Sequence, residues 1–178
     1  MDPISPLGSL DELLDLLRRS ADLPELEVGV GQLDHGLQCT DLLRAEHPDD
    51  ELAVAGLVHD LASSLGARPE DHGEEGALLV GRLLGTRVAD LVRLHVPAKR
   101  YLVATDPVYR TTLSAGSIRT LERQGDAMDP SEITRFEAET ELAGALALRR
   151  ADDRAKDPGR PTSPLPGWTA TLRALVER

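Results

Sequence analysis

The sequence predicts an all-α protein, a single-domain helical bundle, from the kind of apolar residues it contains and from their spacing. Hydrophobic residues make up 40% of the 178 residues, but aromatic residues only 2%. The core must therefore be built from Leu, Val and Ala, as in packed helices. Apolar residues recur at helical spacing along the chain, whereas no stretch shows the alternation of a half-buried strand. The length suffices for one domain with a sizeable core, which we expect to span residues 1–178.

The first part of the chain predicts three helices. A capping box at Ser9-Leu-Asp-Glu12 begins a helix whose leucines share one face. Pro24 and two glycines within residues 21–31 indicate a loop, and a second helix is expected over about residues 32–45. A third helix, over about residues 50–65, contains the dipeptide His59-Asp60.

Two further helices are expected in the middle of the chain. Residues 66–70 indicate a turn, after which His72 begins the fourth helix. The fifth begins near Thr86 and is expected to end at Pro97, because proline disfavours helical backbone at the preceding residue. His95 would then lie in the last turn of this helix.

The last part of the chain begins with a helix after Pro107 that carries an unusual polar stripe: Ser117, Thr120 and Gln124. A second capping box, Asp129-Pro-Ser-Glu132, starts a long helix to about Lys156. One face of that helix carries Arg149, Asp152 and Lys156. A Pro-rich segment and a short closing helix occupy residues 158–178.

Charge and cysteine content exclude several classes of protein. The net charge of −11 argues against binding to nucleic acid or to an anionic membrane, although a small anionic substrate could still enter a locally basic pocket. The single cysteine, Cys39, rules out an intrachain disulfide and a multi-cysteine zinc site, and it suits a reducing cytoplasm. We find no signal-peptide pattern and no membrane-length apolar run, so a cytoplasmic location is expected.

The dipeptide His59-Asp60 stands in an otherwise apolar run, residues 55–61. Burying an unpaired polar group costs roughly 2–7 kcal/mol, and burying a charge costs more. A bound metal ion would remove that cost, since imidazole and carboxylate are natural ligands. For this pair alone, a histidine bonded to a backbone carbonyl and an aspartate exposed at a helix kink is the favoured explanation.

Other residues change that balance. Four of the five histidines fall on separate apolar helical stretches, and they are joined by two aspartates: His35, His59, His72, His95, Asp60 and Asp152. Six nitrogen and oxygen ligands without a thiolate suit a pair of first-row metal ions better than one zinc ion. Asp60 could bridge the pair with its two oxygens.

The spacing of His35, His59-Asp60 and Asp152 matches the H…HD…D pattern of the HD-domain superfamily of helical bundles. Longer stretches resemble a narrower branch, the HD-domain mixed-valent diiron oxygenases that degrade organophosphonates, which includes 2-amino-1-hydroxyethylphosphonate dioxygenase. The resemblance covers about residues 30–157 and is carried by four segments: residues 32–39, 95–102, 113–125 and 148–156.

This resemblance implies two iron ions, Fe(II) and Fe(III), with O2 as co-substrate. It assigns one iron to His35, His59, Asp60 and Asp152, and the other to His72, His95 and the bridging Asp60. It also implies that a small phosphonate is held by Lys99, Ser117, Thr120 and Arg149, with Gln124 lining the same pocket. Lysine, arginine and hydroxyl groups are suitable donors to such a dianion. The alternatives are surface salt bridges for the two cations and helix back-bonding for the two hydroxyls.

Two positions depart from the branch. Its members commonly have a histidine where this chain has Ser63, four residues after His59. The best-known members also place a Tyr and a Glu in the loop before the first ligand, where this chain has Glu25 and Val28; Glu27 could substitute only after a register shift. Ser63 and Glu27 are therefore candidates to support the metal site from outside, and the substrate is the property most affected.

Three functions follow from this pattern. The leading one is an O2-dependent diiron oxygenase acting on a small hydroxy- or amino-substituted phosphonate, with cleavage of the C–P bond or a related C–H oxidation. The second is a metal-dependent HD phosphohydrolase of a small phosphate ester or nucleotide, in which the ions would activate water. The third is a degenerate HD module that binds a ligand or partner, which would require the loss of metal ligands.

Overall fold

The computed structural model describes residues 4–23 and 29–178, and within these residues it is helical with no strand. The all-α prediction is therefore confirmed. The helices are α1 (Leu10–Ser20), α2 (Gln32–Glu46), α3 (Asp50–Val58), α4 (Leu61–Ser64), α5 (His72–Leu84), α6 (Thr86–Thr105), α7 (Tyr109–Thr112), α8 (Ala115–Arg123), α9 (Pro130–Glu137), α10 (Leu142–Arg154) and α11 (Leu165–Val176). None of these helices is long and apolar enough to cross a membrane.

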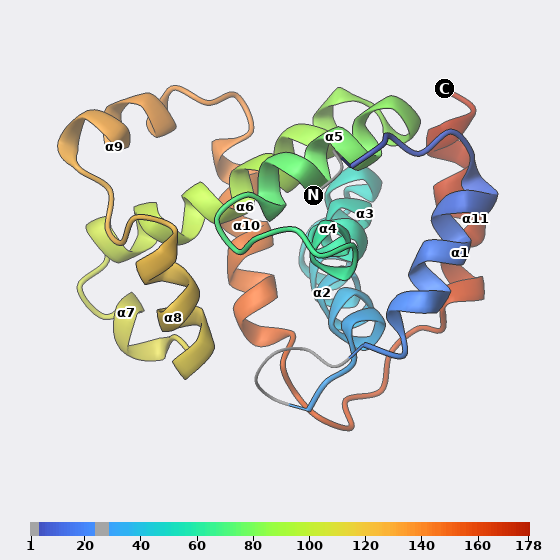
Figure 1. The fold of residues 1–178 in the computed structure, drawn as a ribbon, viewed down its shortest axis with the longest axis horizontal. Helices are drawn as coiled ribbons and strands as arrows, with labels where there is room; N and C mark the ends of the chain where they lie inside the picture. Colours follow the sequence, from blue (N-terminus) through green and yellow to red (C-terminus); the bar gives the residue numbers. More distant parts are fainter. Residues whose placement is uncertain (1–3, 24–28) are drawn as a thin grey trace.

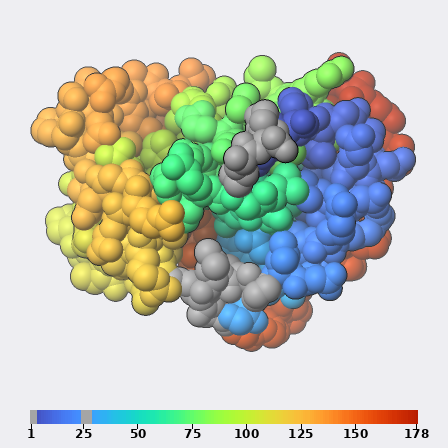
Figure 2. All heavy atoms as spheres, viewed as in Figure 1, coloured from blue at the N-terminus to red at the C-terminus, as the bar shows by residue number. Residues whose placement is uncertain are grey.

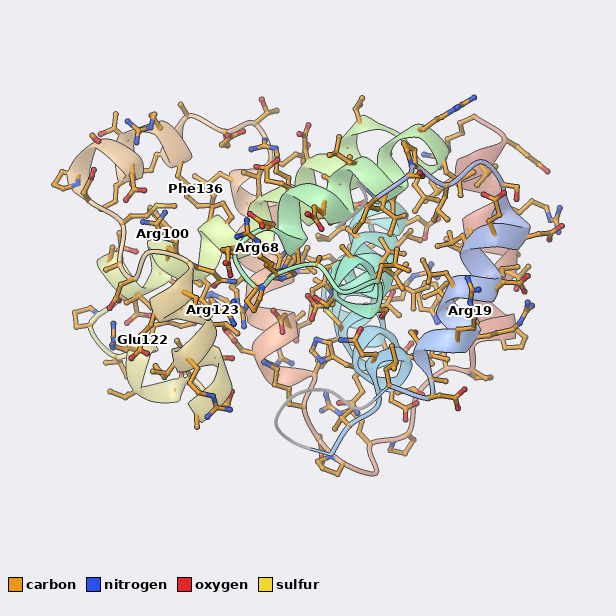
Figure 3. The ribbon with its side chains drawn as sticks, in the orientation of Figure 1. Arg19, Arg68, Arg100, Glu122, Arg123 and Phe136 are labelled. Carbon is orange, nitrogen blue, oxygen red and sulfur yellow. The ribbon has the colours of Figure 1, made fainter. Side chains whose placement is uncertain are left out.

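The centre of the bundle consists of α2, α3, α5, α6 and α10 (Figure 1). Helices α1 and α11 cover one side, and α7, α8 and α9 lie on the other. The main hydrophobic core lies between the central helices and the pair α1 and α11, and α11 contributes Trp168 and Leu172 to it. A smaller cluster around Phe136 fixes α9 against α6 and α10 (Figure 3).

Close backbone packing sets the distance between α2 and α3. A side-chain carbon at Gly36 would lie 2.7 Å from the carbonyl oxygen of Leu57, so only glycine fits at this position. The contact brings His35, the residue before Gly36, beside the end of α3 where His59 begins the connection to α4. The absence of a side chain at Gly36 therefore allows α2 and α3 to approach closely enough to bring His35 near His59.

Both predicted caps are present, with one difference. Asp129 forms the complete capping box with Glu132. Ser9 caps α1 by accepting the N–H of Glu12, but the Glu12 carboxylate accepts the N–H of Gly8 instead of that of Ser9. The reciprocal bond is therefore made one residue earlier than predicted.

The expected helix over residues 50–65 and the expected end at Pro97 are wrong. The chain turns at His59-Asp60 and continues as the short α4. Helix α6 runs through Pro97 to Thr105, so His95 lies in mid-helix and not in a last turn. The Arg93 carbonyl, which lacks the usual i+4 N–H donor because of the proline, lies against Gly73 of α5. Packing between α5 and α6 thus overrides the local preference.

The two later helices are each divided. The helix expected after Pro107 consists of α7 and α8, because Ser114 caps a new helix by accepting the Ser117 N–H. The long helix expected to reach Lys156 consists of α9 and α10, separated at residues 138–141. The division lets α9 pack outward over α6 while α10 passes through the centre of the bundle (Figure 1).

Candidate metal centre and adjoining pocket

The six predicted ligand residues converge in the middle of the bundle. Two groups form there, each with ligand atoms within 4.8 Å of one another: His35, His59 and Asp152; and Asp60, His72 and His95. In the first group the Nε2 atom of His35 lies 3.3 Å from both His59 Nε2 and an Asp152 oxygen. In the second, His72 Nε2 lies 2.9 Å from His95 Nε2.

Asp60 connects the two groups. Its Oδ1 atom lies 3.2 Å from His72 Nε2 and 3.6 Å from His95 Nε2. Its Oδ2 atom lies 3.6 Å from His59 Nε2 and 3.8 Å from His35 Nε2. One carboxylate oxygen therefore faces each group, which is the arrangement of a bridging ligand.

Backbone carbonyls orient all four imidazoles. The Nδ1 atoms lie 2.6–2.8 Å from the carbonyl oxygens of Ala155, Gly56, Pro69 and Val92 for His35, His59, His72 and His95 respectively. A neutral imidazole that donates through Nδ1 presents a bare lone pair at Nε2. Four lone pairs and two carboxylates then face one another with no proton between them, and cations between them would make this arrangement favourable.

Electrostatics favour the ligand forms of His59, His95, Asp60 and Asp152, whereas at His72 burial is outweighed by the Asp60 carboxylate, which raises the imidazole pKa. Burial lowers the pKa of His95 to about 4, and it also lowers the pKa of His59. Burial opposes ionisation of Asp60, but the neighbouring imidazoles, His59 first, hold its pKa well below its usual range. The pKa of Asp152 is likewise held low against burial, chiefly by Arg149. Neutral imidazoles and ionised carboxylates are the states that bind transition metals.

A cavity of about 670 Å³ opens beside the second group. Its walls include Asp60, His72 and His95 on the metal side, and Ser117, Thr120 and Gln124 of the α8 segment opposite. Figure 2 shows the surface hollowed between α8 and the segment that precedes α5. The predicted polar stripe of α8 therefore faces the metal centre across the pocket.

Lys99 and Arg149 are buried in the wall of this cavity, each 3% exposed, so the surface salt-bridge alternative is wrong for both. Lys99 Nζ donates to Thr120 Oγ1 over 2.8 Å. Burial lowers the pKa of Lys99 to about 7, and the charge of Arg149 acts in the same direction. Thr120 also back-bonds to the Ser117 carbonyl at 3.1 Å, so the back-bonding alternative is present for this hydroxyl together with its lysine contact.

The sequence patterns gave no role to three residues near Arg149: Tyr109, Asp153 and Lys156. Arg149 pairs with Asp152 at 2.6 Å and closely with Asp153, which accepts a 2.5 Å hydrogen bond from Tyr109 Oη. Lys156 Nζ donates to Ser117 Oγ at 3.2 Å. The i+4 spacing of Arg149 and Asp153 was a usable signal. No local signal places Tyr109 there, because it comes from a distant helix.

Ser63 and Asp60 both line the cavity, and a role for Ser63 in support of the metal site stays a prediction. Glu25, Glu27 and Val28, where the sequence departs from the resembling branch, lie outside the described residues. Binding of metal and of substrate by the residues named above stays a prediction. The structure contributes their convergence on one centre and one cavity.

A helical bundle that gathers four histidines and the Asp60 and Asp152 carboxylates in this way has the features of an HD-domain metalloenzyme. No family model matches the chain. It is 34% identical over 159 residues to 1-hydroxy-2-(trimethylamino)ethylphosphonate dioxygenase (glycine-betaine-forming) of Leisingera caerulea, covering 84% of this chain and 81% of that protein. It is 33% identical over 161 residues to hydroxymethylphosphonate dioxygenase of Gimesia maris, covering 83% and 79%. The chain belongs to the HD-domain family of these dioxygenases and is an oxygenase.

Proposed function

We propose that this protein is an O2-dependent diiron oxygenase that oxidises a small hydroxy- or amino-substituted phosphonate and cleaves its C–P bond. The observation that carries the proposal is the pair of His/Asp groups joined by Asp60 beside a buried cationic pocket. The two relatives, named as phosphonate dioxygenases, support the same substrate class.

His35, His59 and Asp152 would hold one ion and His72 and His95 the other, with Asp60 shared between them. When bound, a pair of Fe(II) and Fe(III) ions would supply one electron to O2, and the phosphonate that is oxidised would supply the electrons that complete its reduction. The donor set fits this group, since it consists of imidazole and carboxylate without thiolate. With Asp60 counted for both positions, the second position has three protein ligands and the first has four. All three ligands of the second position line the cavity, so it leaves more positions for exogenous ligands.

The other pocket residues would bind and orient the substrate. Lys99, Thr120 and Ser117 place an ammonium and two hydroxyls in the cavity wall, and Arg149 and Lys156 add positive charge. Charge-assisted bonds to a phosphonate in this partly desolvated site would be stronger than the same bonds in water. A phosphonate held there would share the cavity with Asp60 and Ser63, which also line it.

The experiment is turnover of iron-reconstituted protein with hydroxymethylphosphonate and with 2-amino-1-hydroxyethylphosphonate, measured as O2 uptake and phosphate release. We expect phosphate release that requires O2. His72→Ala should abolish it, whereas His47→Ala, a histidine outside the cluster, should retain it. Phosphate release that continues under argon, or release from phosphate esters alone, would overturn the oxygenase proposal in favour of hydrolysis.

A further inference from the structure

The carbonyl oxygen of Pro69 accepts two hydrogen bonds, from residues of two different helices. His72 Nδ1 lies 2.7 Å from it, and Gln124 Nε2 also lies 2.7 Å from it. His72 begins α5, whereas Gln124 is the C-cap of α8. A residue of the predicted substrate wall therefore holds the same oxygen that orients a predicted metal ligand.

The orientation of the Gln124 amide is fixed by this contact. The reversed amide would place its oxygen against the Pro69 carbonyl oxygen, so Nε2 must be the atom that faces Pro69. Gln124 Oε1 is buried beside the cavity and has no hydrogen-bond partner among the described residues. A buried acceptor without a donor costs about 1–3 kcal/mol, and a donor on a bound substrate would remove that cost.

A second contact joins the same two segments. Arg123, at the end of α8, lies 3.3 Å from a Glu70 carboxylate oxygen, and Arg68 lies 3.6 Å from the other oxygen of that carboxylate. Figure 3 labels both arginines on these neighbouring segments. The end of α8 is thus tied to residues 68–70 at two points, immediately before the chain reaches His72.

We infer that Gln124 is a positioning residue: through the Pro69 carbonyl it fixes the imidazole of His72 and couples the substrate wall of α8 to the second metal position. A shift of α8 on substrate binding would move the oxygen that orients His72. By reciprocity, loading of the metal position would favour the arrangement of α8 that binds substrate. The substrate half of this inference rests on the proposed function, whereas the metal half does not.

The test is a titration of the metal-free full-length protein with Co(II), followed by its absorption spectrum, without phosphonate and without O2. Gln124→Met keeps the length of the side chain but cannot donate to Pro69, and Gln124→Ala provides a second variant. We expect both to weaken one of the two Co(II) sites by roughly three- to tenfold, below the 10–100-fold typical of groups that touch a ligand directly. The other site should be unchanged.

Two controls identify the affected site. Glu122→Gln alters an exposed neighbour on the same helix and should leave both affinities unchanged. His72→Ala removes the second position, so adding Gln124→Met to it should leave the remaining affinity unchanged. Equal weakening of both sites, or no weakening in either Gln124 variant, would overturn the inference.

A third measurement addresses the coupling. Adding hydroxymethylphosphonate without O2 should increase the Co(II) affinity of the site that the Gln124 variants weaken. We expect this increase in the wild type and a smaller one in Gln124→Met. Equal tightening in both proteins would overturn the coupling. If no phosphonate were turned over in the earlier experiment but the titration alone gave the expected result, the proposed function would fail and the positioning role would stand.

Discussion

Replacing Lys99 by methionine should weaken phosphonate binding and, at the same time, stabilise the protein. The side chain is 3% exposed, and its ammonium lies 2.8 Å from Thr120 in the wall of the cavity. Methionine has a similar length and shape but carries no charge. The substitution therefore separates the function of the charge from the packing of the side chain.

The magnitude follows from the burial of the ammonium. Burial lowers the pKa of Lys99 from its ordinary value of 10.5 to about 7. Between these values the unfolded chain binds the proton and the folded chain does not, so the contribution of Lys99 to stability improves by about 1.4 kcal/mol per pH unit as pH rises. Below pH 7 both states are protonated, and the folded state carries the full penalty of roughly 4–5 kcal/mol. Lys99→Met should be more stable by a few kcal/mol at pH 6.5, and this advantage should shrink toward pH 9.

Substrate binding changes in the opposite direction. A hydrogen bond to a charged group contributes roughly 1.5–3 kcal/mol, so the variant should raise the KM for the phosphonate about 10- to 100-fold. In the wild type, deprotonation of Lys99 above its pKa of about 7 should raise KM as pH increases, and the variant should lose this dependence.

Urea unfolding of the wild type and of Lys99→Met, both freed of metal with a chelator, measures the stability effect from pH 6.5 to pH 9. The pH profile of KM measures the effect on substrate binding. The two proteins are compared without metal because bound ions add their own stabilisation. Metal loading adds positive charge and so lowers the Lys99 pKa further in the same direction. A difference in unfolding free energy that stays constant across this pH range, together with an unchanged KM, would refute the reasoning.

Three shorter predictions concern other parts of the site. Tyr109→Phe removes the 2.5 Å hydrogen bond to Asp153 and should raise KM roughly fivefold with little change in kcat, as steady-state kinetics will show; a lower kcat at constant KM would contradict this. Asp60→Asn should reduce bound metal to one ion or fewer per chain by elemental analysis, and retention of two ions would exclude a bridge. Gly36→Ala would place a methyl carbon 2.7 Å from a carbonyl oxygen of α3 and should lower the unfolding free energy by roughly 1–3 kcal/mol. Gly167→Ala, which meets nothing within 4 Å, is the matched control and should be neutral or stabilising.

The helical class and most helix starts could be predicted because they depend on local chemistry. Capping side chains such as Asp129 act within three residues, and apolar spacing is also a local pattern. The course of α6 could not be predicted, because Pro97 is tolerated through packing against another helix. Sequence rules consider only the local effect of the proline on the helix and cannot include the packing of α5 against α6.

The residue types of the site were predictable, but several of their partners were not. His35 and His95 were recognisable as buried polar groups in apolar helices. The carbonyl that orients a ring, such as that of Val92 for His95, depends on the local backbone geometry. The contact between Tyr109 and Asp153 joins segments that are distant in the chain. Such second partners leave no periodic trace in the sequence, although they decide which nitrogen faces the centre.

The break that the sequence pattern failed to predict is what allows His59 and Asp60, which are neighbours in the chain, both to face the centre. In a continuous helix, neighbouring side chains point about 100° apart, and a buried face would present only one of the two. Here α3 ends at Val58, and its C-cap His59 donates to the Gly56 carbonyl and faces His35. Asp60, already in the turn before α4, places one oxygen toward each half. The apolar helix is thus interrupted at the position from which the Asp60 carboxylate reaches both groups.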